Sequence, residues 1–251
     1  MSENPEPGLE LVSQAPKQRR PIGCVPALLL LAAAAVVIAM MLPSVRRTRS
    51  SARRSQCKDN LKQIAVALYN YERDYHSLPP AYTVDADGKP LHSWRTLILP
   101  YLGMNPLYDT INLSKPWNDP ANAEACNIIV PEFHCPANAG PPNHSTYMAI
   151  VAPNGCFRPT EPRRFSEITD NLSETLMVIE VPVDRSVHWM SPNDADESLV
   201  MGIGLESKLS HLNGMDAAFC DGSIRFLSAG MPADQRRALI SIAGGDTAGD
   251  F

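Results

Sequence analysis

The chain has 251 residues, which is enough for one sizeable domain and one shorter segment. With 44% hydrophobic and 20% charged residues, its composition is that of a folded protein rather than a disordered one. The formal net charge of −5 is unevenly distributed: residues 46–62 carry seven Lys and Arg against one acid, and from residue 63 onward 12 basic and 23 acidic residues follow. An acidic body excludes nucleic acid as the expected partner, because phosphate binding requires a basic surface.

The N-terminal region predicts a membrane anchor. Residues 1–20 are polar and are expected to form a disordered cytoplasmic tail, whereas residues 21–45 contain no charged side chain. As a helix this apolar run would be about 37 Å long, enough to cross a bilayer core of about 30 Å. A cleaved signal peptide is the weaker interpretation, because the run is long and the flank after it is strongly basic. We expect a transmembrane helix over 21–45 and the lipid bilayer as a partner.

The basic run at 46–62 bears on topology. Anionic lipid headgroups are the partner that such a run beside a membrane segment favours. Counted literally, the positive-inside rule places residues 46–251 in the cytoplasm.

Beyond the apolar run the helix is predicted to continue to residue 76. Apolar side chains recur at spacings of three and four, which gives one apolar face; they are Cys57, Leu61, Ile64, Leu68, Tyr71 and Tyr75. Pro79 and Pro80 end the helix, since proline cannot continue it and disfavours helix in the preceding residue. Pro43 is expected to kink it.

The rest of the chain predicts short elements. Residues 77–90 are expected to form a loop, and residues 93–102 have helical spacing. Asp119-Pro120 is typical of a helix start, for a helix near 120–129, and residues 232–243 predict a last helix with Gly244 at its C-cap. Predicted strands cover residues 146–151, 175–181, 215–220 and 223–227, with Asp221-Gly222 as a hairpin turn between the last two. Helix first and antiparallel strands after it is an α+β order.

Six cysteines are present, with no CxxC and no Cys/His spacing typical of zinc. In an exported domain, Cys126, Cys135, Cys156 and Cys220 could form two disulfides, and four cysteines allow three pairings. Cys126 with Cys135, and Cys156 with Cys220, are the pairs we favour. No metal site and no cofactor is predicted.

Several stretches resemble a large bacterial prepilin-like family, domain of unknown function 1559. They are residues 41–82, SWRTLILPYL at 93–102, FHCP at 133–136, STYMAIV at 145–151 and ITDNLSETLMVIEV at 168–181. His211, nine further residues and then Asp221-Gly222 resemble the signature of the C-terminal part of that family. The resemblance covers about residues 41–248. It implies a type IV pilin-like architecture, in which a long N-terminal helix is both membrane anchor and spine, packed on an antiparallel β-sheet head that is exported.

One departure from the family pattern is visible at the N-terminus. Prepilin-like members carry a Gly-Phe-Thr-Leu-x-Glu processing site before the apolar run, whereas this chain has Gly23-Cys24-Val25-Pro26 and no Glu in the run. We therefore expect an uncleaved, anchored relative. The resemblance favours export of the head, residues 46–251, to the periplasm from the inner membrane, against the charge count.

The function predicted from these observations is structural. We expect a non-enzymatic, pilin-like or pseudopilin-like assembly protein, with other pilin-like subunits as candidate partners. The alternative is an anchored envelope module that binds calcium or glycan through its acidic head; an enzyme using His211 is the third reading. For the signature we prefer a structural role: Asp221-Gly222 makes the turn, because Asp-Gly accepts positive φ, and His211 hydrogen-bonds in the loop before the strand. Asp194, Asp196 and Glu197 are expected to form a solvated acidic loop.

Overall fold

The computed structural model describes residues 24–245 and 248–249, and the chain divides into two compact units between Arg47 and Thr48. The predicted tail at 1–20 and the start of the predicted span at 21–45 lie outside the described residues. Among the residues that are described, no helix is long and apolar enough to cross a membrane.

Helix α1 runs without interruption from Cys24 to Tyr75 and passes through Pro43. Its last five turns carry most of the predicted apolar face: Leu61, Ile64 and Leu68 are fully buried, whereas Tyr75 is 62% exposed. The helix ends where His76 adopts a left-handed conformation with φ 57°, followed by the Leu78-Pro79-Pro80 stop. The predicted extent, 22–76, is therefore close to the observed one.

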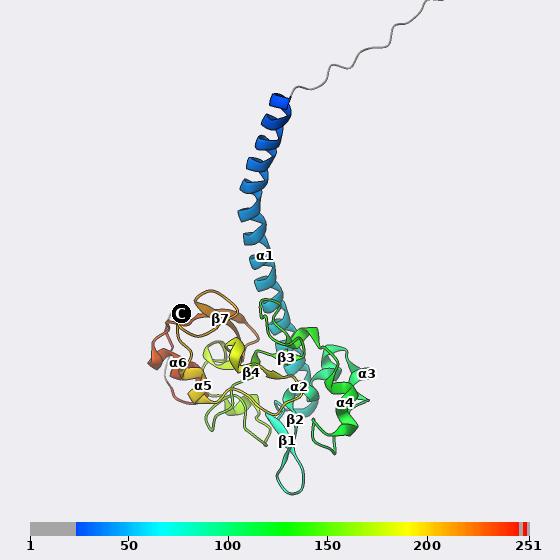
Figure 1. Ribbon diagram of the computed structural model, residues 1–251. Helices are drawn as coiled ribbons and strands as arrows, with labels where there is room; N and C mark the ends of the chain where they lie inside the picture. The colour runs from blue at the N-terminus through cyan, green and yellow to red at the C-terminus, as the bar shows by residue number, and fades with distance from the viewer. Residues whose placement is uncertain (1–23, 246–247, 250–251) are drawn as a thin grey trace, which may run out of the picture. The chain divides into compact units, whose positions relative to one another are not determined.

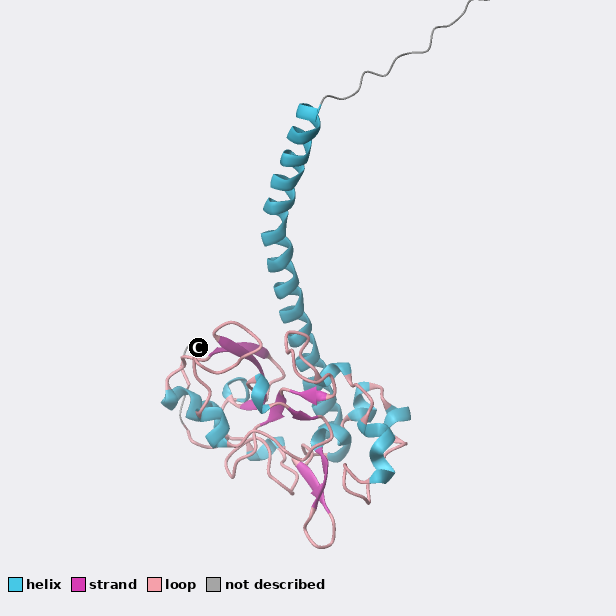
Figure 2. Cartoon of the chain, in the orientation of Figure 1, coloured by secondary structure: helices cyan, strands magenta, loops and turns pink. Residues whose placement is uncertain are grey.

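The second unit is an α+β head, as predicted, with short strands joined by long loops (Figures 1 and 2). Its strands are β1 (Tyr82–Val84), β2 (Pro90–Ser93), β3 (His144–Ser145), β4 (Tyr147–Ala149), β5 (Leu176–Glu180), β6 (Val187–His188), β7 (Gly214–Phe219) and β8 (Ile224–Ser228). Its further α-helices are α2 (Trp94–Leu97), α3 (Asn105–Tyr108), α4 (Ala123–Cys126), α5 (Glu197–Met201) and α6 (Ala233–Ile240). Six 3₁₀ turns complete the described part: Leu99–Leu102, Pro120–Asn122, Pro131–Phe133, Phe165–Glu167, Leu172–Glu174 and Val183–Arg185.

The central sheet is antiparallel, in the order β4-β5-β7-β8. Because successive strand residues point to opposite faces, β7 divides its side chains between two cores. Ala218 packs in the core that contains the buried face of α1, whereas Ala217 and Phe219 pack with Leu239 of α6 on the other face. The head is thus layered as α1, sheet, and the α5–α6 pair.

Several predicted elements differ from the observed ones. Residues 77–90 are not all loop, because β1 and β2 pair around a turn in which Asp85 Oδ1 accepts hydrogen bonds from the backbone N–H groups of Asp87 and Lys89. The predicted helix at 93–102 is split at Ile98, since Pro100 has no N–H to continue the helical hydrogen bonding. The last helix is capped at Ser241 rather than at Gly244.

Candidate functional site

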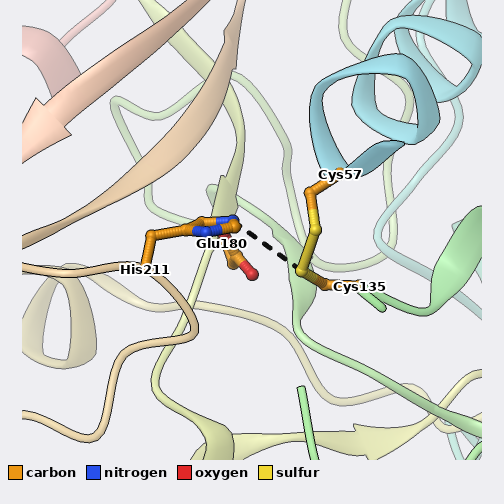
Figure 3. Close-up of side chains that lie close together, drawn as sticks. All are labelled: Cys57, Cys135, Glu180 and His211. Atoms are coloured by element: carbon orange, nitrogen blue, oxygen red, sulfur yellow. Dashed lines mark hydrogen bonds and ion pairs between the residues drawn. A yellow bond between two sulfur atoms is a disulfide. The ribbon is translucent and has the colours of Figure 1, made fainter. Parts of the chain in front are cut away.

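His211 lies at the centre of a buried group of reactive side chains that come from four parts of the chain. We call His211, Glu180, Asp216 and the Cys57–Cys135 pair the His211 cluster. The Nε2 atom of His211 lies 3.3 Å from Glu180 Oε2, 3.5 Å from Asp216 Oδ2 and 3.8 Å from Cys135 Sγ. Figure 3 shows the imidazole pointing toward the disulfide, with Glu180 beside it. The cluster brings β5, β7, helix α1 and the loop around residue 135 to one point.

The disulfide of this cluster joins Cys57 and Cys135 across 78 residues. The favoured pairing of Cys126 with Cys135 is therefore wrong: Cys57 on the buried face of α1 takes Cys135, and Cys126 is a free thiol whose Sγ lies 3.6 Å from Met190 Sδ. Proximity in the sequence did not predict the pairing, because α1 packs against the head and places Cys57 beside Cys135.

Cys156 and Cys220, the other favoured pair, are brought together without a bond. Their sulfur atoms lie 3.2 Å apart and both residues are fully buried. Burial and the neighbouring Cys156 raise the pKa of the Cys220 thiol well above its ordinary value, which keeps it protonated. The structure thus places this pair within reach of oxidation to a disulfide.

The carboxylates of Glu180 and Asp216 are almost completely buried, and within the part of the chain that the structure describes neither has a hydrogen bond of good geometry; His211 Nε2, at 3.3 Å and 3.5 Å, is beside both. Arg54 and Lys58 approach Asp216, each at 3.9 Å, from α1. Burying unpaired carboxylates is costly, so these groups must be compensated by charge.

The pKa values follow from this environment. Burial raises the pKa of Asp216, and the nearby His211 offsets this only in part. Burial by itself would lower the pKa of His211, but Glu180 and Asp216 more than compensate, so the imidazole has a raised pKa. The two buried carboxylates therefore favour the protonated form of His211.

A cavity of about 400 Å³ lies against the cluster on the side of His211. Its lining consists of Ser50, Ser51, Arg53, Arg54, Ala137, Ser210, His211 and Leu212. His211 belongs to both the cavity wall and the cluster, so the cavity borders the buried group.

The other end of the signature forms the turn that the sequence predicted. Gly222 has φ 77°, a left-handed conformation that glycine adopts without strain, and Asp221 Oδ1 accepts a hydrogen bond from the backbone N–H of Ser223. The turn is also fastened to α1, because Lys62 donates to the Gly222 carbonyl at 2.8 Å and the Tyr69 hydroxyl donates to the Cys220 carbonyl.

The spacing of the signature fits this geometry. A strand of six residues such as β7 spans about 20 Å, and the twelve residues of α1 from Cys57 to Tyr69 rise about 18 Å. His211 and Asp221-Gly222 thus contact α1 at the two ends of one strand. The sequence predicts that His211 hydrogen-bonds within its own loop. Its side chain instead reaches into the core.

A second buried ion pair lies elsewhere in the head. The guanidinium of Arg95 lies 2.7 Å from Asp194 Oδ1 and also donates to the Ser93 hydroxyl and to the carbonyls of Tyr147, Ser191 and Asn193. Asp194 Oδ1 further accepts from Trp94 Nε1 and from the Ala149 backbone N–H. We call this group the Arg95 network. Burial raises the pKa of Asp194 to about 6, against the opposing effect of Arg95.

The expectation of a solvated acidic loop at 194–197 is therefore wrong for Asp194, which is buried. Asp196 caps helix α5 by accepting from the Leu199 N–H at 2.7 Å. Oδ1 of each carboxylate is occupied by protein donors, and Asp194 is paired with Arg95, which disfavours calcium binding at this loop.

Glu180, Asp216 and Cys57 are site residues that sequence reasoning missed. A signal was present for the acids, because each stands alone inside an apolar strand, in TLMVIEV and in GMDAAF. A charged residue in a buried strand needs a partner, and that requirement could have pointed to His211.

Comparisons with known proteins identify the family. The family model described as "Protein of unknown function (DUF1559)" matches residues 46–208, which confirms the resemblance drawn from the sequence motifs. The match ends before His211 and before Asp221-Gly222. No curated protein and no solved structure matches the chain.

Proposed function

The chain belongs to the DUF1559 family, and from that premise we propose that it is a membrane-anchored, pilin-like structural protein with an exported head. The observation that carries the proposal is the continuity of α1. One helix of 52 residues is shared by an apolar N-terminal stretch and by the head, where its last turns form part of the core.

The apolar stretch supports an anchoring role. No charged residue occurs between Arg20 and Arg46, and the leucines at positions 28–31 are each more than 60% exposed. A run of exposed leucines is unfavourable in water and favourable in a bilayer. Assembly with other pilin-like subunits is the extension of this proposal that the family resemblance implies.

The disulfide supports export. Disulfides persist in oxidising compartments such as the periplasm and are rare where thioredoxin and glutathione keep thiols reduced. The Cys57–Cys135 bond joins α1 to the head within the second unit, so it would protect the junction between spine and sheet outside the cytoplasm.

Membrane fractionation of the full chain tests the anchor. We expect the wild-type protein to remain with membranes after alkaline carbonate washing, and Leu29→Asp/Leu30→Asp to shift to the soluble fraction, because each charge costs about 3 kcal/mol in a bilayer. Leu205→Asp/Leu212→Asp is the matched control, since these leucines, 64% and 88% exposed, are also solvent-exposed but lie in the head. A wild-type chain recovered in the soluble fraction would contradict the anchor.

Topology is tested on the same cells. Protease added to intact spheroplasts should degrade the head while a cytoplasmic marker survives. Protection of the head would contradict export and leave a cytoplasmic, membrane-tethered role.

A further inference from the structure

The His211 cluster has the donor atoms of a zinc site. One ligand atom from each of Cys57, Cys135, Glu180 and His211 lies within 4.8 Å of all the others, and all four residues are buried. Two sulfurs, an imidazole nitrogen and a carboxylate oxygen form a set that Zn²⁺ accepts in tetrahedral sites.

The distances within the cluster agree with such a site. Metal bonds of about 2.0–2.1 Å to N and O and about 2.3 Å to S, at tetrahedral angles, separate N from O by roughly 3.3 Å and N from S by roughly 3.6 Å. The separations from His211 Nε2 are 3.3 Å to Glu180 Oε2 and 3.8 Å to Cys135 Sγ. The separations from His211 Nε2 to one oxygen and one sulfur are thus already close to those that a bound ion requires, and the two sulfurs, bonded in the disulfide, must move apart on reduction.

We propose that Cys57, Cys135, His211 and Glu180 bind one Zn²⁺ when the Cys57–Cys135 disulfide is reduced. A dithiol supplies two electrons and two protons, the Sγ–Sγ bond breaks, and the dithiol becomes a disulfide. Zn²⁺ then displaces the two thiol protons and bonds to both thiolates. Cross-link and metal site are therefore alternative states of the same two sulfur atoms, because a disulfide sulfur is not a thiolate ligand.

The scarcity of protein donors around the Glu180 carboxylate, which has His211 as its nearby charged partner, is a second reason. Glu180 is 1% exposed, and neither of its oxygens accepts a hydrogen bond from the described residues. A purely structural carboxylate at such a position would normally be hydrogen-bonded, whereas a metal ligand must keep its oxygens available.

Charge also favours a divalent ion in the reduced state. Two thiolates together with Glu180 and Asp216 are balanced by Arg54, Lys58 and one Zn²⁺. Calcium fits poorly, because it takes six to eight oxygen ligands and this site offers sulfur and nitrogen. The cavity of about 400 Å³ borders the site at His211.

The test uses the full chain in detergent, reduced with a phosphine, which does not compete for the metal as a dithiol would. Co²⁺ is added as a spectroscopic substitute for Zn²⁺. We expect one equivalent to give tetrahedral d–d bands and a thiolate-to-cobalt charge-transfer band, and one equivalent of Zn²⁺ to abolish both. The oxidised chain should give neither band. Absence of the bands in the reduced chain would overturn the proposal.

Variants assign the ligands. Cys57→Ser, His211→Gln and Glu180→Gln should each weaken Co²⁺ binding by on the order of tenfold or more, whereas Cys156→Ser, at the other sulfur pair, should bind as the wild type does. Unchanged binding in both His211→Gln and Glu180→Gln would show a cysteine-only site and contradict the ligand set.

Alkylation of the wild-type chain keeps the test independent of folding defects in the variants. Zn²⁺ should protect Cys57 and Cys135 from alkylation and leave the half-buried Cys126 reactive. Equal labelling with and without Zn²⁺ would contradict the site. The inference concerns the head alone, so it survives or fails separately from the membrane anchor.

Discussion

The Arg95 network and the His211 cluster bury similar groups and stabilise them in opposite ways. In the network all five guanidinium N–H groups of Arg95 are used, and Asp194 Oδ1 accepts three hydrogen bonds. In the cluster the carboxylates have charged neighbours but no hydrogen bonds from the described residues, and a disulfide supplies the connection. Satisfied hydrogen bonds fix one structure, whereas unsatisfied ligand atoms remain free to respond to a proton, an electron pair or a metal.

Tyr147 joins the two regions. Its carbonyl accepts from Arg95 Nε, and its hydroxyl donates to the Cys57 carbonyl at 3.3 Å. Burial, together with Glu180 and Asp216, raises the pKa of Tyr147 well above its ordinary value. The two regions therefore differ in their hydrogen bonding, and not in how deeply their side chains are buried or in how far apart they lie.

The largest effect should come from the network. Arg95→Ala leaves the Asp194 carboxylate buried without its cation, so we expect a loss of about 3–5 kcal/mol in the free energy of unfolding. Urea unfolding of the full chain, followed by tryptophan fluorescence, measures it. Arg237→Ala is the control, because its ion pair with Glu197 is solvent-exposed and should contribute less than about 1 kcal/mol. Similar losses in the two variants would mean that the buried, hydrogen-bonded ion pair contributes no more to stability than an exposed one.

The next largest loss of stability should come from removing the disulfide of the cluster. Cys57→Ala/Cys135→Ala should lower the free energy of unfolding by about 2–4 kcal/mol, because the bond closes a loop of 78 residues. Cys156→Ala/Cys220→Ala removes an equally buried but unbonded pair, so it reports the loss of packing alone. Equal losses would mean that the cross-link stabilises the cluster no more than packing does.

The pH dependence should distinguish the regions by pH range, because the raised pKa of Asp194, about 6, affects stability mainly below pH 6.5. The raised pKa of His211 means that the folded state holds its proton more tightly than the unfolded chain does. This stabilisation is complete below the ordinary pKa of about 6.5 and is lost as pH rises through the folded value. We therefore expect the Tm of the full chain to fall by a few degrees between pH 6.5 and pH 8, and to stay nearly constant in His211→Gln.

That pH window separates His211 from the other histidines whose pKa values are shifted. His92 and His188 have pKa values lowered by burial, so their effect on stability lies below pH 6.5 and has the opposite sign. The side chains facing His211 are Glu180 from β5, Asp216 from β7, and Arg54 from α1. A Tm that falls equally in both proteins would assign the pH effect to a group outside the cluster.

The sequence predicted local features better than contacts between distant residues. The apolar face of α1, the Asp119 cap and the Asp221-Gly222 turn each depend on residues a few positions apart, and all three are present. The Cys57–Cys135 pairing depends on how α1 crosses the head, which no local pattern encodes. The β1–β2 hairpin was mistaken for a loop because its strands are three and four residues long and Pro90 begins the second.

The smallest expected change in the free energy of unfolding gives the most direct comparison of the cluster with the network. Glu180→Gln removes a buried charge that accepts no hydrogen bond from the described residues, and it relieves repulsion with Asp216, so we expect the free energy of unfolding to change by less than about 1 kcal/mol in either direction. Asp194→Asn is the matched variant in the network, where the charge is paired with Arg95; it should cost about 3 kcal/mol or more. Both changes replace one carboxylate by an amide at a fully buried position, and urea unfolding compares them directly. A loss in Glu180→Gln as large as that in Asp194→Asn would mean that His211 alone satisfies Glu180, and that the cluster is as much a structural ion pair as the network is.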